Sequence, residues 1–113
     1  MTSTASGDSH CAPAIIHGPL LNQEPGLGAL TLPGYLRAVT QRSGDREALV
    51  FYEHERPVRW TYFQLWKNAV DVARSLLALG CGKDTRVGVR MTNRPEWLSA
   101  VFGASIAGCV AVP

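Results

Sequence analysis

The chain has 113 residues, of which 46% are hydrophobic and 18% are charged. These values suit a single globular domain and exclude a wholly disordered chain. The net charge is +2 and the basic residues are scattered, so the sequence shows no electrostatic footprint for nucleic acid. No apolar run approaches the ~20 residues that a membrane-spanning helix needs, and no signal peptide is visible.

The three cysteines, Cys11, Cys81 and Cys109, are an odd number and contain no C-x-x-C pair. This pattern indicates neither a disulfide framework nor a zinc site. We expect Cys109 to be a small core residue in an apolar strand and Cys81 to be a turn residue between two glycines. A reducing, cytoplasmic location is the expectation that suits them best.

Residues 1–28 are rich in Ser, Thr, Pro and Gly, and we expect them to be a flexible leader. His10, Cys11 and His17 could suggest a metal site in this leader. No fourth ligand stands at a recognisable spacing, so a mobile tail is the favoured interpretation. The remaining residues, 29–113, are expected to begin one larger α/β domain.

The first predicted helix begins at Thr31, which can cap it, and Pro33 fits its first turn. Four apolar residues recur at helical spacing, which predicts one buried face. They are Leu32, Tyr35, Leu36 and Val39. The helix is expected to end at residues 43–45, where Ser, Gly and Asp follow one another.

Residues 48–52 and 58–60 predict two strands joined by a charged turn, as in a β-hairpin. Thr61 and Gln64 then form a T-x-x-Q capping box at the start of the longest helix. Gly80 is expected to end that helix in the left-handed conformation.

The last third of the chain predicts a strand over 85–91, a helix from Asn93 and a second strand ending at Pro113. Asn93, with Glu96 three residues later, resembles a helix N-cap. We predict that Trp97 and Leu98 are buried against the first of these strands. The helix also carries small residues that permit close packing against a sheet. They are Gly103, Ala104 and Ala107.

This strand–helix–strand unit is normally built with parallel strands covered on both faces. The predicted fold class is therefore α/β, with a β-hairpin, a βαβ unit and an incomplete sheet. Because Val110 and Val112 would be left on an uncovered strand, we expect the chain to be the front part of a larger protein, truncated at Pro113.

Several residue groups could carry chemistry, but each favours a structural role. The pair Gly26 and Gly28 lacks the third glycine of a dinucleotide fingerprint, and Gly103 with Gly108 lacks the Lys-Ser/Thr of a phosphate loop. His54 lies in a solvated charged turn, which makes general-base work improbable. We predict no catalytic, cofactor-binding or metal-ligating residue in this chain.

Three segments nevertheless resemble motifs of the adenylate-forming enzymes, the acyl-CoA synthetase superfamily. Residues 60–65 read W-T-Y-F-Q-L, similar to the family's T-Y-x-E-L. Residues 86–89 read R-V-G-V, similar to G-D-R-V-A-I, and residues 105–113 resemble K-A-G-x-x-x-V-P. The sequence departs from these motifs at Gln64, Lys83 and Ser105. Their order and spacing resemble the family over residues 32–113.

The resemblance implies a two-step reaction in which ATP and a carboxylic acid form an acyl-adenylate and pyrophosphate, and a thiol then takes the acyl group. ATP, Mg²⁺ and coenzyme A would serve the full-length enzyme in fatty-acid metabolism. The family's phosphate loop and catalytic lysine would lie beyond Pro113, so whether this chain acts as an enzyme stays open. Its implied partner is the missing downstream part.

The first hypothesis is thus an N-terminal scaffold segment of an acyl-CoA synthetase that is inactive alone. The alternative is a small stand-alone α/β interaction module without catalysis, which would use Val110 and Val112 to bind a partner.

Overall fold

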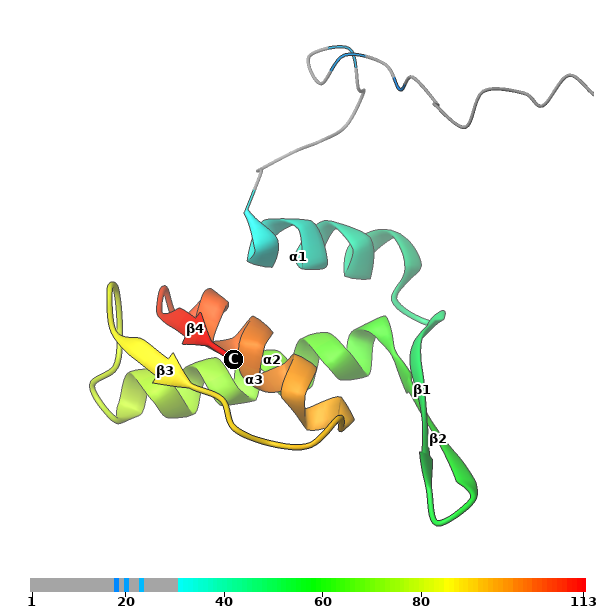
Figure 1. Ribbon diagram of the computed structural model, residues 1–113. Coiled ribbons are helices and arrows are strands. Elements are labelled where there is room, and N and C mark those ends of the chain that lie inside the picture. Colours follow the sequence, from blue (N-terminus) through cyan, green and yellow to red (C-terminus); the bar gives the residue numbers. More distant parts are fainter. Residues whose placement is uncertain (1–17, 19, 21–22, 24–30) are drawn as a thin grey trace, which may run out of the picture.

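The computed structural model describes residues 18, 20, 23 and 31–113 (Figure 1). It is a mixed α/β structure with three helices and four strands in these residues. In chain order they are α1 (Leu32–Ser43), β1 (Glu47–Glu53), β2 (Arg56–Thr61), α2 (Tyr62–Ala78), β3 (Arg86–Gly88), α3 (Pro95–Ile106) and β4 (Val110–Val112). The predicted fold class is confirmed. The leader expected at 1–28 lies almost wholly outside the described residues.

Helix α1 is capped as predicted, because Thr31 Oγ1 accepts a hydrogen bond from the Gly34 amide at 3.2 Å. Its predicted apolar face is only half right. Leu32 and Tyr35 are 50% and 59% exposed, and the buried stripe runs through Leu36 and Thr40 instead. Thr40 can join this stripe because its hydroxyl donates to the carbonyl of Leu36, four residues earlier, at 2.8 Å.

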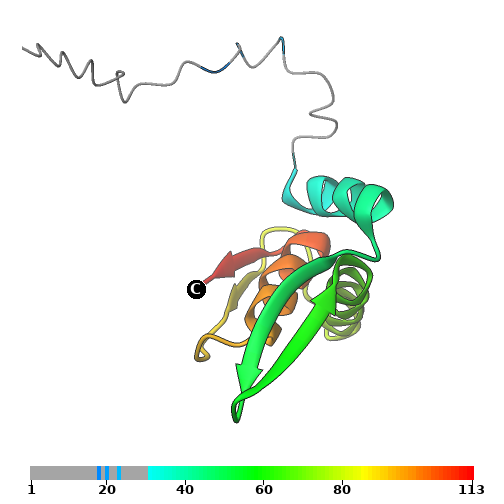
Figure 2. The same ribbon diagram turned by 90° about the vertical axis from the view of Figure 1, so that its right-hand side faces the viewer.

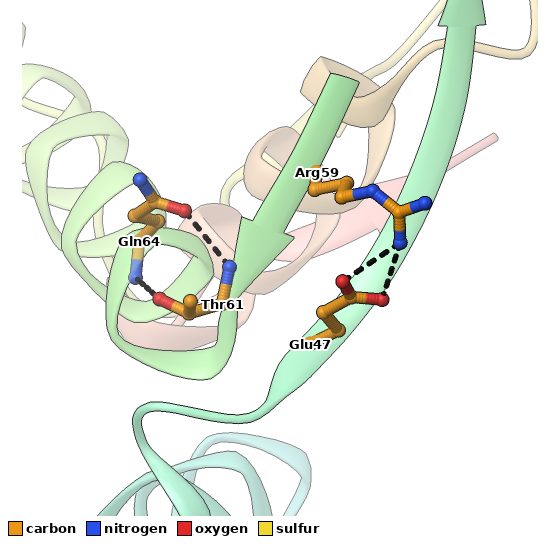
Figure 3. Close-up of polar contacts among 4 residues, drawn as sticks. All are labelled: Glu47, Arg59, Thr61 and Gln64. Carbon is orange, nitrogen blue, oxygen red and sulfur yellow. Dashed lines mark hydrogen bonds and ion pairs between the residues drawn. The ribbon is translucent and has the colours of Figure 1, made fainter. Parts of the chain in front are cut away.

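The predicted hairpin is confirmed: β1 pairs antiparallel with β2, with one register shift between Glu47 and Leu49. A two-residue turn joins them, with His54 and Glu55 at φ values of 46° and 66°. Positive φ at both positions is the mark of the type I′ turn that suits the twist of a hairpin. Near the other end, Arg59 Nη1 donates to both carboxylate oxygens of Glu47, at 2.7 and 2.9 Å (Figure 3).

The capping box of α2 is also confirmed (Figure 3). The Gln64 amide donates to Thr61 Oγ1 at 3.3 Å, and the Thr61 amide donates to Gln64 Oε1 at 2.8 Å. The helix ends with Gly80 at φ 83°, as expected for a left-handed helix stop. Three residues of one stripe are buried: Leu65, Ala69 and Ala73.

Strands β3 and β4 are parallel, with Arg86 opposite Val110, and α3 crosses between them. Strand β3 covers three residues rather than the predicted 85–91. The ladder continues slightly further, since the Val89 amide donates to the Val112 carbonyl at 2.8 Å. In Figure 1 this pair lies at one end of α2 and α3, and the hairpin lies near the other end.

The predicted cap of α3 at Asn93 is wrong. The N-cap is Arg94, with no side-chain hydrogen bond to the helix start. Pro95 is the first helical residue, and a residue before proline is restricted to extended backbone. Arg94 accordingly has φ −132° and ψ 155°, so the proline places the N-cap at Arg94, one residue beyond Asn93.

The burial predicted for α3 is partly wrong as well. Trp97 and Leu98 are half-buried, not buried, and the buried face consists of smaller residues. They are Pro95, Ser99, Gly103 and Ala104. At Gly103 this face packs closely on α2, because a Cβ atom there would lie only 2.6 Å from Val72 Cβ. Ala104 of the same face belongs to the core beside the parallel strands. Small residues, not Trp97 and Leu98, are buried on this face because they let the backbones of α2 and α3 approach closely.

A small apolar core joins the helix pair to the parallel strands. Its buried members are Ala73, Ala104, Ala107 and Cys109. Cys109 is thereby confirmed as a core residue. Cys81, expected as a turn residue, packs half-buried against this core, because it directly follows the glycine that ends α2. No helix of the described residues is long and apolar enough to span a membrane.

Candidate functional site

The starts of the three described helices bear on whether phosphate could bind to this part of the chain. Free N–H groups at a helix N-terminus are a ready anion site. Thr31 and Thr61 side chains take such groups in α1 and α2. Helix α3 begins with Pro95, which has no N–H, and Glu96 adds a carboxylate to that turn. The two capped starts have one free N–H group fewer for a phosphate, and the carboxylate of Glu96 disfavours an anion at the start of α3.

A divalent cation finds no better set of ligands. Among the described residues, no three His, Cys, Asp or Glu side chains come together in a way that could hold a metal ion. Glu47 is paired with Arg59, and Asp71 with Lys67 at 2.9 Å. The Lys67 hydrogen bond lowers the pKa of the Asp71 carboxyl. His10, Cys11 and His17, the metal site that the sequence could suggest, lie outside the described residues.

The side chains that could act as nucleophile or base have structural surroundings. His54 is exposed at the tip of the hairpin, in a turn with positive φ. Ser105 Oγ donates to the Val101 carbonyl at 2.9 Å, inside α3. Cys81 and Cys109 are free thiols within or beside the apolar core. Among the residues that the structure describes, none of these four has the nucleophile–base contact that covalent catalysis needs.

A groove of about 270 Å³ runs between the hairpin and the start of α3. Its walls are mostly apolar. They are formed by Leu49, Val50, Phe51, Asn93, Arg94, Pro95, Trp97 and Leu98. In Figure 2 the hairpin lies in front of α3.

Arg94 joins the two sides of this groove. Its Nη2 donates to Glu53 Oε1 at 3.3 Å, on β1, and its Nε donates to Glu96 Oε2 at 3.2 Å, on α3. The guanidinium also lies 5.9 Å from the centre of the Phe51 ring, within the range of a cation–π contact. Its hydrogen bond to Glu96 raises the pKa of Arg94 and lowers that of Glu96.

Sequence reasoning misses this junction. No local spacing connects Arg94 with Glu53, which stands 41 residues earlier. A second groove, of about 550 Å³, opens at the end of the parallel strands and is lined by Val89, Met91, Trp97 and Val112 among others. Neither groove gathers an acid, a base and a nucleophile among its lining residues.

Comparison with known proteins adds the family. The family model described as AMP-binding enzyme matches residues 36–113. The acyl-CoA ligase SID4 of Ajellomyces capsulatus is 36% identical over 88% of this chain, but the match covers 16% of that protein. The chain thus spans about one sixth of the length of this relative.

Solved structures agree with the sequence relatives. The fatty acid AMP ligase of Legionella pneumophila superposes with a TM-score of 0.73 and 29% identity, over 77% of this chain and 15% of that one. The fatty acyl CoA synthetase of Mycobacterium tuberculosis superposes with a TM-score of 0.66 and 35% identity, over 74% of this chain and 16% of that one. The hairpin, the helix pair and the parallel strands therefore recur in known acyl-activating proteins.

Proposed function

Because this chain belongs to the AMP-binding enzyme family, we propose that it forms the N-terminal scaffold of an ATP-dependent acyl-CoA synthetase and is inactive alone. One observation supports the proposal: the family-like segments lie where helices and strands begin or end. Residues 60–65 make the capped entry to α2, residues 86–89 contain β3, and residues 105–113 contain the stop of α3 and all of β4. They position secondary structure and do not converge on one reacting centre.

The chemistry of the proposed enzyme explains why a scaffold would be inactive alone. Forming an acyl-adenylate from ATP and a carboxylic acid requires stabilisation of phosphate charge by backbone donors, cationic side chains and Mg²⁺. Among the described residues, no cluster of metal-binding side chains occurs, and Glu47 and Asp71 are already paired with basic side chains, which supports the proposal. In this proposal the ATP, Mg²⁺ and coenzyme A groups are held by other parts of the whole enzyme.

The substrate class in this proposal is a fatty acid, supported by the names of the Legionella and Mycobacterium proteins. A cytoplasmic location is part of the same proposal. It is supported by Cys81 and Cys109, which are free thiols.

The first test measures the 113-residue chain alone. Calorimetric titration with ATP and Mg²⁺ should give no saturable heat at micromolar concentrations, and pyrophosphate release should stay at the blank rate with fatty and aromatic acids. The Mycobacterium synthetase, assayed beside it, is the positive control. Turnover by the chain itself would overturn the scaffold proposal.

The second test asks whether the chain can serve as a scaffold. Residues 36–113 should replace the matching segment of the Mycobacterium synthetase and leave measurable acyl-adenylate formation in the chimera. A chimera that folds cooperatively and binds ATP but forms no adenylate would contradict the proposal, because a pure scaffold leaves the reacting groups of its host intact.

The alternative, a stand-alone interaction module, has one observation in its favour. Val110 and Val112 are 48% and 44% exposed on β4, and Met91 beside them is 45% exposed. Exposed apolar side chains on a strand promote association. Analytical ultracentrifugation separates the two ideas: a discrete, saturable homodimer formed through this strand would favour the module.

A further inference from the structure

We propose that the β1–β2 hairpin is an arm whose closure over the start of α3 is set by Arg94. The hairpin is anchored firmly at its base. There the Tyr62 amide donates to the Arg46 carbonyl at 3.1 Å, and the Phe63 amide donates to the Gly44 carbonyl at 3.0 Å. At its far end, among the described residues, the polar contact to the rest of the protein is the one between Glu53 and Arg94.

The backbone of α3 places Arg94 where it can hold the arm. Since Pro95 follows, Arg94 is restricted to the extended conformation, and it stands just outside the helix as its N-cap. From there its guanidinium reaches two carboxylates on different elements, Glu53 on β1 and Glu96 on α3. The centre of the Phe51 ring lies 5.9 Å from the same guanidinium. One side chain thus contacts the arm twice and its own helix once.

The groove between arm and helix is what this closure controls. With Arg94 in place, the space of about 270 Å³ is bounded by Phe51 on the arm and by Trp97 and Leu98 on α3. Releasing Arg94 would let the arm move outward about its base and would expose Trp97 to water. The arm therefore acts as a strap that covers this apolar groove.

The junction is weak enough to open. The side chains of Arg94 and Glu53 are 44% and 46% exposed, so dissolved salt screens their attraction. Closure should accordingly loosen as ionic strength rises. An arm held only by apolar burial would not respond in this way, and this difference makes the proposal testable.

The test uses the whole chain labelled with 5-fluorotryptophan at its three tryptophans, Trp60, Trp66 and Trp97. The ¹⁹F line of Trp97 reports on the groove, and that of Trp66 on α2 serves as the internal control. In Arg94→Gln, the Trp97 line should move toward that of the free amino acid, with a larger H₂O/D₂O isotope shift. Raising NaCl to ~0.5 M, where the Debye length falls well below 10 Å, should do the same in the parent and nothing further in the variant.

Two further comparisons keep the result specific. Glu53→Gln should move the Trp97 line in the same direction as Arg94→Gln but less far, because Arg94 keeps its contact with the Phe51 ring. The double variant should move the line no further than Arg94→Gln alone, since both changes remove the same ion pair. Arg74→Gln and Glu55→Gln are the matched controls. Arg74 pairs within α2 only, and Glu55 is the neighbouring carboxylate in the turn. An unchanged Trp97 line in both test variants, or equal movement of the Trp66 line, would overturn the proposal.

Discussion

Helices α2 and α3 end in the same way but begin differently. Gly80 and Gly108 follow them at φ 83° and 78°. In each, the residue after the glycine donates its amide to the carbonyl five positions earlier, at 3.0 Å in α2 and 2.8 Å in α3. The glycine amides donate to the carbonyl three positions earlier, at 3.0 and 3.1 Å. Both ends are therefore Schellman motifs, and both place a cysteine against the same core.

The starts of the two helices have little in common. Thr61 caps the start of α2 through a reciprocal capping box. Arg94 precedes α3 without a side-chain cap, and its side chain instead donates to Glu53 on the hairpin. The difference shows that a glycine ends a helix because it can adopt positive φ, a conformation that a neighbouring residue cannot adopt in its place. A polar N-cap, in contrast, is moved by one residue when proline dictates the first helical position.

The largest effect should come from breaking the contact between the two helices at Gly103. A Cβ atom there would lie 2.6 Å from Val72 Cβ and 2.8 Å from the Ala69 carbonyl oxygen. Gly103→Ala should lower the free energy of unfolding by about 1–3 kcal/mol, the usual cost of overpacking. Urea unfolding followed by circular dichroism measures it.

The control for that variant is Gly88→Ala, because nothing lies within 4 Å of a Cβ atom at Gly88. It should leave the urea midpoint nearly unchanged. Equal midpoints for Gly103→Ala and the parent would show that α2 and α3 are not in the close contact described here.

The next largest effect tests the shared helix ends. Gly80→Ala and Gly108→Ala should each cost about 1–2 kcal/mol, since a Cβ atom disfavours positive φ. The two costs should be similar, because an added Cβ meets nothing near Gly80 and only an ordinary 3.8 Å contact with Lys83 near Gly108. Thermal unfolding of both variants provides the measurement. Gly82→Ala, at an open position without positive φ, is the control.

If one of the two glycine variants proved neutral while the other did not, the shared geometry of the helix ends would be refuted. Replacing either glycine by Asn should recover part of the loss, since Asn tolerates the left-handed conformation better than Ala.

The helix ends illustrate what the sequence could predict. Gly80 and the Thr61–Gln64 pair are local signals, in which residue type and spacing determine the outcome within one turn. The hairpin is equally predictable from the sequence, because two runs rich in β-branched and aromatic residues flank a charged turn. The three motifs at residues 60–65, 86–89 and 105–113 are local signals of the same kind, and their order along the chain is enough to indicate the family.

Other features could not be predicted, since they depend on what packs against what. The apolar residues Trp97 and Leu98 suggest a buried face, yet the helix pair selects small residues such as Gly103 for its contact. The Arg94–Glu53 pair joins residues 41 positions apart, so it exists only once hairpin and helix have been folded together. The candidate groove between them is invisible in the sequence for the same reason.

A smaller effect sharpens the comparison of helix starts. Thr61→Ala should lower the free energy of unfolding by ~1 kcal/mol, since it leaves the Gln64 amide without its acceptor. Asn93→Ala should change it by less than ~0.5 kcal/mol, as is usual for an exposed residue without a special role. Chemical denaturation of both variants decides the matter, and a larger loss for Asn93→Ala would restore it as the cap of α3.

The smallest effect, of opposite sign, concerns the buried hydroxyl of Ser99. Thr40, Ser75 and Ser105 all donate to the carbonyl four residues earlier, at 2.8 to 3.0 Å. Ser99 is only 4% exposed, yet its Oγ has no hydrogen-bond partner. Ser99→Ala should therefore raise the free energy of unfolding by about 0.5 kcal/mol, because it removes an unsatisfied buried group and improves helix propensity. Ser105→Ala, which loses a hydrogen bond made at 2.9 Å, should give no such gain. Denaturation midpoints of the two variants measure the contrast, and a clear loss of stability in Ser99→Ala would mean that its hydroxyl is satisfied after all.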